Sequence, residues 1–247
     1  MKNYFGNEEQ KYYITEEAQY RRIYEIISNM PNFVLSESYD TTYRDVFYDT
    51  KDKFLEVNRA SCRVRLLDNG DLLSIKYISS NPYTEAKERE GYLDLPKNTD
   101  IANNKQALMF LSTKLNDVYS SRIDMDIMRK LRDVKPYLVI DTKRTVHILK
   151  NNEDLQIAIK FDRLTYQSKF LSQNDLVVKI ELLNYPDSVN LDTYNRFIKE
   201  LRKKAILIPD NESKFEAGKR IFNLDRFNKK PKNEEESEEE KKKYNKK

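Results

Sequence analysis

The chain has 247 residues, enough for one large domain or two small ones, and a formal net charge of +4. Its content of 38% hydrophobic and 35% charged residues fits a globular protein with a heavily charged surface or interior. Only 4 glycines are present, so a glycine-rich phosphate loop is excluded and any bound phosphate must be held by side chains. One cysteine, Cys62, and one histidine, His147, exclude an intramolecular disulfide and leave no Cys/His cluster for a zinc site.

The first half of the chain predicts short strands separated by a few helices. Thr15 is the expected N-cap of a helix that runs to about Met30. Asn69-Gly70 is a strong turn signal and predicts the tip of a hairpin within 61–77. The remaining expectations are strands over 9–14, in two pieces between 33 and 50 and over 85–95, a short helix or turn over 51–58, a helix over 101–115 and an ambiguous segment up to 133.

The second half predicts further strands that hairpins join. We expect strands over 137–149, 155–166 and 176–183, and helices over 191–204 and from about Ser213. Strands and helices do not alternate as in a Rossmann fold. The sequence therefore predicts an α+β fold, with a large antiparallel barrel or sheet and helices packed outside it.

The end of the chain has a different composition. From about Asn228 onward no aliphatic residue occurs, and blocks of acidic and basic residues follow one another. Such a segment cannot bury an apolar core, so we expect a folded domain over 1–227 and a disordered charged tail over 228–247. No apolar run approaches the roughly 20 residues of a membrane span, and the N-terminus has no apolar signal region. We predict a soluble, cytoplasmic protein.

Charged residues occupy one face of nearly every predicted strand. Side chains alternate across a strand, so Arg63 and Arg65 share a face, and so do Lys179 and Glu181. Such faces commonly meet water, but a solvated face usually mixes many polar residue types, whereas Arg and Lys recur here. Like charges destabilise a sheet unless counter-ions lie between them. The pattern favours a barrel interior that binds a polyanion, because the arginine fork suits phosphate and acids can hold a bridging divalent cation.

Several short segments, in their order and spacing, resemble the triphosphate tunnel metalloenzymes, the superfamily of CYTH domains and VTC-type polyphosphate polymerase domains. They are FYDTKDKFL (47–55), CRVR (62–65), SIKY (74–77), KRT (143–145), IKFD (159–162), KIEL (179–182) and SKFEAGK (213–219). The resemblance covers most of 5–226, and the run ISSNPYTEAKER (78–89) resembles the VTC branch. The family's ExExK hallmark reads NEEQK here, from Asn7 to Lys11.

The resemblance implies an eight-stranded antiparallel tunnel that binds triphosphate or polyphosphate lengthwise with Mg²⁺ or Mn²⁺. It implies Glu9 and Glu181 as catalytic residues and as metal ligands, with Asp162 a third metal ligand. The phosphate ligands that it implies are Lys11, Arg63, Arg65, Lys76, Arg144 and Lys214. Alternation adds Lys87, Arg89 and Lys160 as substrate-binding candidates.

Two positions depart from the family pattern. Asn7 replaces the first glutamate of ExExK, and Lys179 replaces the first acid of the late E-x-E strand. By alternation, the only inward acids would be Glu9, Asp162 and Glu181, against many more bases. Such a site suits phosphate better than a metal ion. Because an empty tunnel would be crowded with positive charge, we expect alanine at position 63 or 65 to leave the fold intact or to stabilise it slightly.

Three functions remain open at this point. The first is a metal-dependent enzyme that hydrolyses a triphosphate or acts as a polyphosphate polymerase. The second is a binding module for polyphosphate, a nucleoside triphosphate or an RNA 5′-triphosphate end, which Asn7 and Lys179 favour. The third is an unrelated β-rich interaction protein. Protein partners have no recognisable signature in the sequence.

Overall fold

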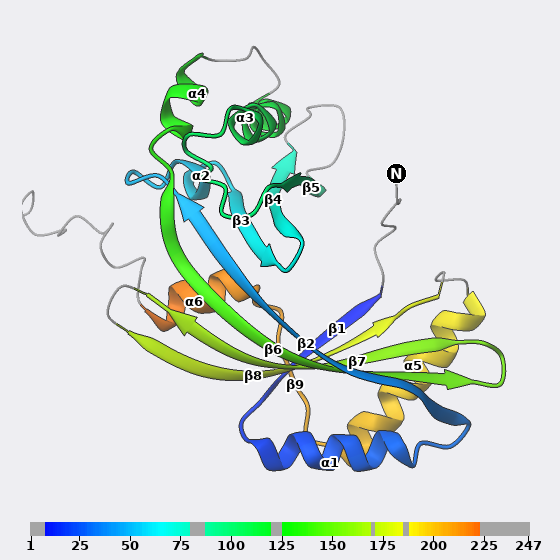
Figure 1. The fold of residues 1–247 in the computed structure, drawn as a ribbon. Helices are drawn as coiled ribbons and strands as arrows, with labels where there is room; N and C mark the ends of the chain where they lie inside the picture. The colour runs from blue at the N-terminus through cyan, green and yellow to red at the C-terminus, as the bar shows by residue number, and fades with distance from the viewer. Residues whose placement is uncertain (1–7, 80–86, 120–124, 169–170, 185–187, 223–247) are drawn as a thin grey trace, which may run out of the picture. The chain divides into compact units, whose positions relative to one another are not determined.

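The computed structural model describes residues 8–79, 87–119, 125–168, 171–184 and 188–222 (Figure 1). The chain separates into two compact units, Met1–Asn211 and Glu212–Lys247. The boundary expected at 227/228 and the charged tail over 228–247 lie outside the described residues. The first unit contains the sheet that carries the candidate site.

An antiparallel sheet forms the framework of the first unit, in the order β5-β4-β3-β2-β6-β7-β8-β1-β9. The strands are β1 (Glu9–Ile14), β2 (Phe33–Asp49), β3 (Ala60–Leu67), β4 (Gly70–Ser79), β5 (Lys87–Leu95), β6 (Lys135–Asn151), β7 (Gln156–Gln167), β8 (Ser172–Leu182) and β9 (Ile208–Pro209). The predicted α+β antiparallel fold is confirmed. The expectation of a closed barrel of eight strands overstates the closure, because the described residues form nine strands in a linear order from β5 to β9. Strand β9 has two residues, too few to show an alternating pattern.

The helices are α1 (Glu17–Ser28), α2 (Phe54–Val57), α3 (Lys105–Tyr119), α4 (Met125–Leu131), α5 (Ser188–Lys204) and α6 (Lys214–Ile221). The expectation that Thr15 caps α1 is wrong, because the N-cap is Glu16 and makes no side-chain cap bond. Instead, the Oε1 atom of Gln19 accepts hydrogen bonds from the backbone N–H and the hydroxyl of Thr15, at 2.8 and 3.2 Å. Helix α6 begins as expected after Ser213, which forms a capping box with Glu216.

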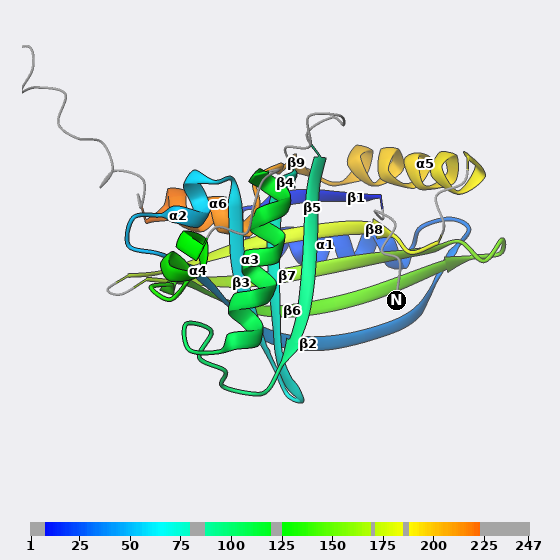
Figure 2. The ribbon, with the colours of Figure 1, turned by 90° about the horizontal axis from the view of Figure 1, so that it is seen from above.

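Strands β2 and β6 form the long central pair of the sheet. The two extended pieces expected between 33 and 50 are one strand of 17 residues, interrupted by a register shift between Leu35 and Glu37. Strand β2 pairs with β6 from Phe33 to Asp49, but it pairs with β3 only from Arg44 to Tyr48. Figure 2 shows β2, β6 and β7 running side by side. The C-terminal half of β2 therefore joins β3–β5 to the rest of the sheet.

The predicted hairpin of β3 and β4 is present, but its turn lies one residue before the expected Asn69-Gly70 tip. Leu67 pairs with Gly70, which leaves Asp68 and Asn69 as a two-residue turn. Gly70 has a φ of +151°, and an added Cβ would lie 3.1 Å from the carbonyl oxygen of Leu95. Glycine satisfies both constraints, because it tolerates this φ and has no Cβ.

Apolar side chains on one face of the sheet pack against helices in two clusters. In the first, strand residues such as Ile159 and Ile180 pack with α1 and α5. In the second, Cys62, Val64 and Ile75 pack with α2, α3 and α4. Figure 2 shows α3 alongside β4 and β5. We refer to this as the helix-covered face. In the described part of the chain, no helix combines the length and the apolar character needed to cross a lipid bilayer.

Candidate functional site: the charged face of the sheet

The opposite face of the sheet carries a continuous series of ionisable side chains. Register fixes their common side: Lys76 lies opposite Glu90, Arg65 opposite Asp45, and Arg144 opposite Asp162. Farther along the sheet, Lys179 lies between Lys160 and Lys11, and Glu181 lies opposite Glu9. We call this set the charged face; its members are Glu9, Lys11, Asp45, Arg63, Arg65, Lys76, Glu88, Glu90, Arg144, Lys160, Asp162, Lys179 and Glu181.

Two arginines of the charged face each bind a buried aspartate through both arms of the fork. Arg65 donates to the two carboxylate oxygens of Asp45 at 2.7 and 2.9 Å. Arg144 donates to those of Asp162 at 2.6 and 2.8 Å. Both carboxylate side chains are 0% exposed. This burial excludes an ordinary solvated strand face at this part of the sheet.

Burial and pairing act in opposite directions on these guanidinium groups. Burial lowers the pKa of Arg65 and Arg144, because it penalises the charged form. The hydrogen bonds and attraction from Asp45 and Asp162 outweigh burial and leave the pKa of both arginines raised. Both guanidinium groups therefore stay charged over the whole physiological range.

Tyr43 lies between these two arginines. The Cζ atom of Arg65 lies 3.9 Å from the centre of the Tyr43 ring, and that of Arg144 lies 5.4 Å from it. Both distances are within the range of a cation–π contact. Burial, followed by the charge of Asp162, raises the pKa of the Tyr43 hydroxyl. The ring thus separates two positive groups that would otherwise repel each other across β2.

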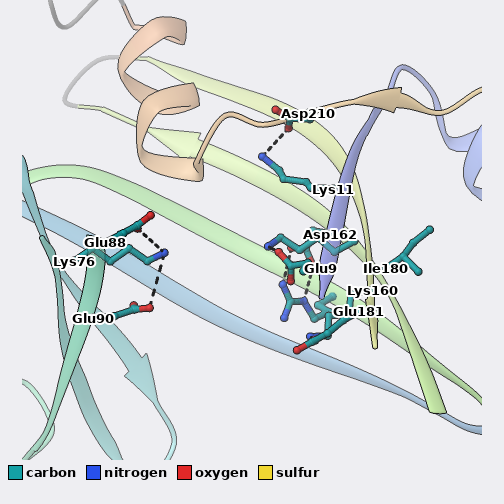
Figure 3. A network of polar contacts seen from close by, with 12 residues as sticks. Glu9, Lys11, Lys76, Glu88, Glu90, Lys160, Asp162, Ile180, Glu181 and Asp210 are labelled. Atoms are coloured by element: carbon teal, nitrogen blue, oxygen red, sulfur yellow. Dashed lines mark hydrogen bonds and ion pairs between the residues drawn. The ribbon is translucent and has the colours of Figure 1, made fainter. Parts of the chain in front are cut away.

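Arg63 and Lys76 are held by longer contacts. The Nε atom of Arg63 donates to the Ser74 hydroxyl at 3.1 Å, while its nearest carboxylate contacts are 3.6 Å to Glu90 and 3.8 Å to Asp45. The Lys76 ammonium lies 3.5 Å from Glu88 and 3.8 Å from Glu90 (Figure 3). These carboxylate distances exceed those of charge-assisted hydrogen bonds. Arg63 and Lys76 can therefore turn towards an incoming anion at less cost than Arg65.

Strands β7, β8 and β1 bring lysines and glutamates together at the other end of the charged face. Lys160 forms an ion pair with Glu181, and the Lys179 ammonium lies 2.5 Å from Glu9. Lys11 binds Asp210, which follows β9, at 2.6 Å. Figure 3 labels five members of this group, with Ile180 pointing to the opposite side: Glu9, Lys11, Lys160, Glu181 and Asp210. Burial, followed by the positive charge of Arg144, lowers the pKa of Lys160.

Most of the residues predicted from sequence in the first unit meet on the charged face, but positions 87 and 89 do not lie there. Arg89 lies opposite Tyr77 and Lys87 opposite Ser79, which places both positions on the helix-covered side of the sheet. Alternation predicted the wrong face for Lys87 and Arg89, because every residue of the KERE run (87–90) is charged and the two faces of the strand look alike in sequence. Lys214 begins α6 in the second unit. Asn7 lies outside the described residues.

The expectation that the inward acids are only Glu9, Asp162 and Glu181 is wrong. Asp45, Glu88 and Glu90 also lie on the charged face, and Tyr43 was not predicted there. Around Asp45, strand β2 carries large apolar residues on both faces, such as Val46 and Phe47, so its phase cannot be read from hydrophobicity. The cross-strand match of Asp45 with Arg65 depends on register, which alternation alone does not give.

Cys62 and His147 both lie on the helix-covered face. Burial raises the pKa of the Cys62 thiol to about 12, so the thiol is protonated and unreactive. The Nδ1 atom of His147 lies 2.9 Å from the Ser38 hydroxyl, and its ring contacts Tyr24 and Phe161. Neither residue contributes to the charged face.

Each carboxylate that the resemblance assigns to a divalent cation has a cationic partner within this chain. Asp162 binds Arg144, Glu181 binds Lys160, and Glu9 binds Lys179. Within the described ranges, no group of three or more His, Cys, Asp or Glu residues is arranged to hold a metal ion. These residues do not fit a metal site built from three protein carboxylates.

No protein-family model and no curated protein matches the chain. Its structure is similar to that of HpAC1 from Hippeastrum, which is described as having a dominant triphosphatase activity: 14% identity, TM-score 0.50, 87% of this chain and 96% of that chain. A Bacillus halodurans protein has 16% sequence identity and a TM-score of 0.44, and the match covers 86% of this chain and 98% of that chain. The Mimivirus capping enzyme triphosphatase has 13% identity and a TM-score of 0.39, and the match covers 80% of this chain and 89% of that chain. At 14% identity, the similarity to HpAC1 concerns the fold alone.

Proposed function

We propose that this chain, which has the fold of the triphosphate tunnel metalloenzymes, binds triphosphate or polyphosphate along its charged face and hydrolyses or transfers a phosphoanhydride bond. The observation that supports this most is the alignment of Arg63, Arg65, Arg144 and Lys160 on one face of the sheet, each with its side chain mostly buried. Guanidinium groups bind phosphate oxygens in pairs, and a linear phosphate chain offers such oxygens at regular intervals.

The side chains of the charged face suit the charge changes of phosphoryl transfer. In hydrolysis, a water oxygen bonds to the terminal phosphorus while the bond from that phosphorus to the bridging oxygen breaks. Arg63 and Lys160 would stabilise the negative charge that develops on the transferred and leaving groups. Glu9 or Glu181 would orient the water and accept its proton. In transfer, a phosphate oxygen of a growing chain takes the place of water.

Phosphate release from triphosphate, ATP and long-chain polyphosphate, each with Mg²⁺ or Mn²⁺, tests the enzymatic part. We expect release from at least one of them, and a fall in kcat of about 10²-fold or more in Glu181→Gln, because general-base assistance contributes about that much. Glu153→Gln is the matched control, since Glu153 is an exposed residue of the β6–β7 turn. Extension of polyphosphate from ATP, followed on a gel, separates transfer from hydrolysis.

The second candidate is a module that binds polyphosphate, a nucleoside triphosphate or an RNA 5′-triphosphate end without turnover. The pairing of Lys179 with Glu9 favours it, because this lysine stands where the resemblance implies an acid. Triphosphate that raises the melting temperature without any phosphate release or chain extension would support this candidate and contradict the enzyme. An unchanged melting temperature at millimolar triphosphate and low salt would contradict both.

A further inference from the structure

Three lysines lie in a row across neighbouring strands of the charged face. In β8, Lys179 is directly opposite Lys11 of β1 on one side and Lys160 of β7 on the other. Directly opposed like charges destabilise a sheet unless opposite charges lie between them. Such a row is therefore an arrangement that needs anions, either from the protein or from a ligand.

The protein supplies one carboxylate to each lysine. Lys11 binds Asp210, Lys179 binds Glu9, and Lys160 binds Glu181. Glu9 and Glu181 lie opposite each other on β1 and β8, in the row next to the lysines. The row of lysines thus lies beside the pair of glutamates, and each glutamate has a lysine partner.

We propose that Lys160 and Lys179 are the built-in cations of this site, so that the chain binds triphosphate without a divalent cation. The inference rests on the proposed function and concerns the charge compensation of the same site. Each ammonium has three N–H donors, of which a carboxylate takes one or two, so donors remain for phosphate oxygens. The two ammonium groups then neutralise the glutamates and the phosphate chain together.

Binding of a divalent cation to Glu9 and Glu181 would be unfavourable. To bind Glu9 and Glu181 it must displace Lys179 and Lys160 from them, and it would then lie beside the ammonium groups that it displaced. Glu9 and Glu181 alone also provide fewer oxygen ligands than Mg²⁺ or Mn²⁺ takes. Replacing Lys179 by an acid removes one of the two ammonium groups, releases Glu9 and adds carboxylate oxygens, which makes Lys179→Glu the informative variant.

Two measurements test this proposal without any activity assay. The first is calorimetric titration of triphosphate with EDTA present and with Mg²⁺ present. We expect wild-type protein to bind in EDTA, and Lys179→Glu to lose at least about tenfold in affinity there, as for a lost charge-assisted hydrogen bond. The second is the electron paramagnetic resonance signal of Mn²⁺ added to the protein. Triphosphate is left out of this measurement, because free triphosphate itself binds divalent cations and would hide binding of the metal to the protein. We expect bound Mn²⁺ in Lys179→Glu and none in the wild type.

Lys143→Glu is the matched control, because it makes the same change of charge at an exposed position on the opposite side of β6. It should bind triphosphate in EDTA as the wild type does and bind no Mn²⁺. Wild-type binding that EDTA abolishes and Mg²⁺ restores would overturn the inference while the proposed function stands. Tight binding of Mn²⁺ by the wild-type protein in the absence of triphosphate would also overturn the inference. An absence of triphosphate binding in both buffers would refute the proposed function itself.

Discussion

Arg63 and Arg65 share a strand face but differ in what holds them. Arg65 satisfies the fully buried carboxylate of Asp45 through both arms of its fork, whereas Arg63 reaches the same carboxylate only at 3.8 Å. The sequence led us to expect that alanine at either position would leave the fold intact or stabilise it. For Arg65 we now expect a loss of stability, because its positive charge is already compensated and its removal would leave the buried carboxylate of Asp45 with only the 3.8 Å contact to Arg63.

Arg65→Ala should lower the free energy of unfolding by about 3–5 kcal/mol, since removal of one partner leaves an uncompensated buried charge. Urea denaturation measures this loss. Arg63→Ala should cost clearly less, because no buried carboxylate depends on it alone. Adding Asp45→Asn to Arg65→Ala should restore part of the stability. If Arg65→Ala is as stable as the wild type, the Asp45–Arg65 pair is not the stabilising element described here.

At the scale of elements, helix α5 fixes the two strands that carry Glu9 and Glu181. The buried Tyr194 hydroxyl donates to the carbonyl oxygen of Ile180 in β8 at 2.8 Å, and it takes a backbone hydrogen bond from Gln10 in β1. Gln10 and Ile180 are directly opposite in the sheet. Burial, which disfavours the phenolate, raises the pKa of this hydroxyl. A single side chain of α5 thus supports the strand pair next to the two glutamates.

Tyr194→Phe should lower the free energy of unfolding by about 1–3 kcal/mol, because buried backbone groups lose their partner. Tyr39→Phe is the control, since Tyr39 is 46% exposed and surface changes stay within about 0.5 kcal/mol. Chemical denaturation of both variants measures the difference. Equal stability of the two variants would show that the hydroxyl does not support the β1–β8 pair.

The elements also show what the sequence could and could not predict. Strands β3 and β8 were assigned the correct faces, because Val64, Val178 and Ile180 form purely apolar sets opposite charged ones. Strand β5 was assigned the wrong phase, because charges occupy both of its faces around Arg89. Alternation gives the face of a residue but not its cross-strand neighbour. The pairing of each lysine and arginine with its own carboxylate therefore became visible only from the register of the folded sheet.

At the scale of the whole molecule, the charged face is close to electrically balanced. The bases Lys11, Lys160 and Lys179, like the arginines, have carboxylate partners. The net charge of +4 is therefore not concentrated there. A phosphate chain that binds there, as proposed, would lie among existing ion pairs and compete with their carboxylates. The partly exposed charges at Lys76 make some of this attraction sensitive to salt.

We propose that the charged face, and not the positive charge of the protein in general, binds a phosphate chain. Calorimetric titration of triphosphate into wild type, Arg63→Ala and Lys143→Ala at low salt tests it most directly. Each variant removes one positive charge, but Lys143 is exposed on the opposite side of β6. We predict that Arg63→Ala weakens binding by about tenfold to a hundredfold, as for a lost charge-assisted contact, while Lys143→Ala binds as the wild type does. Equal affinities of the two variants would contradict the account.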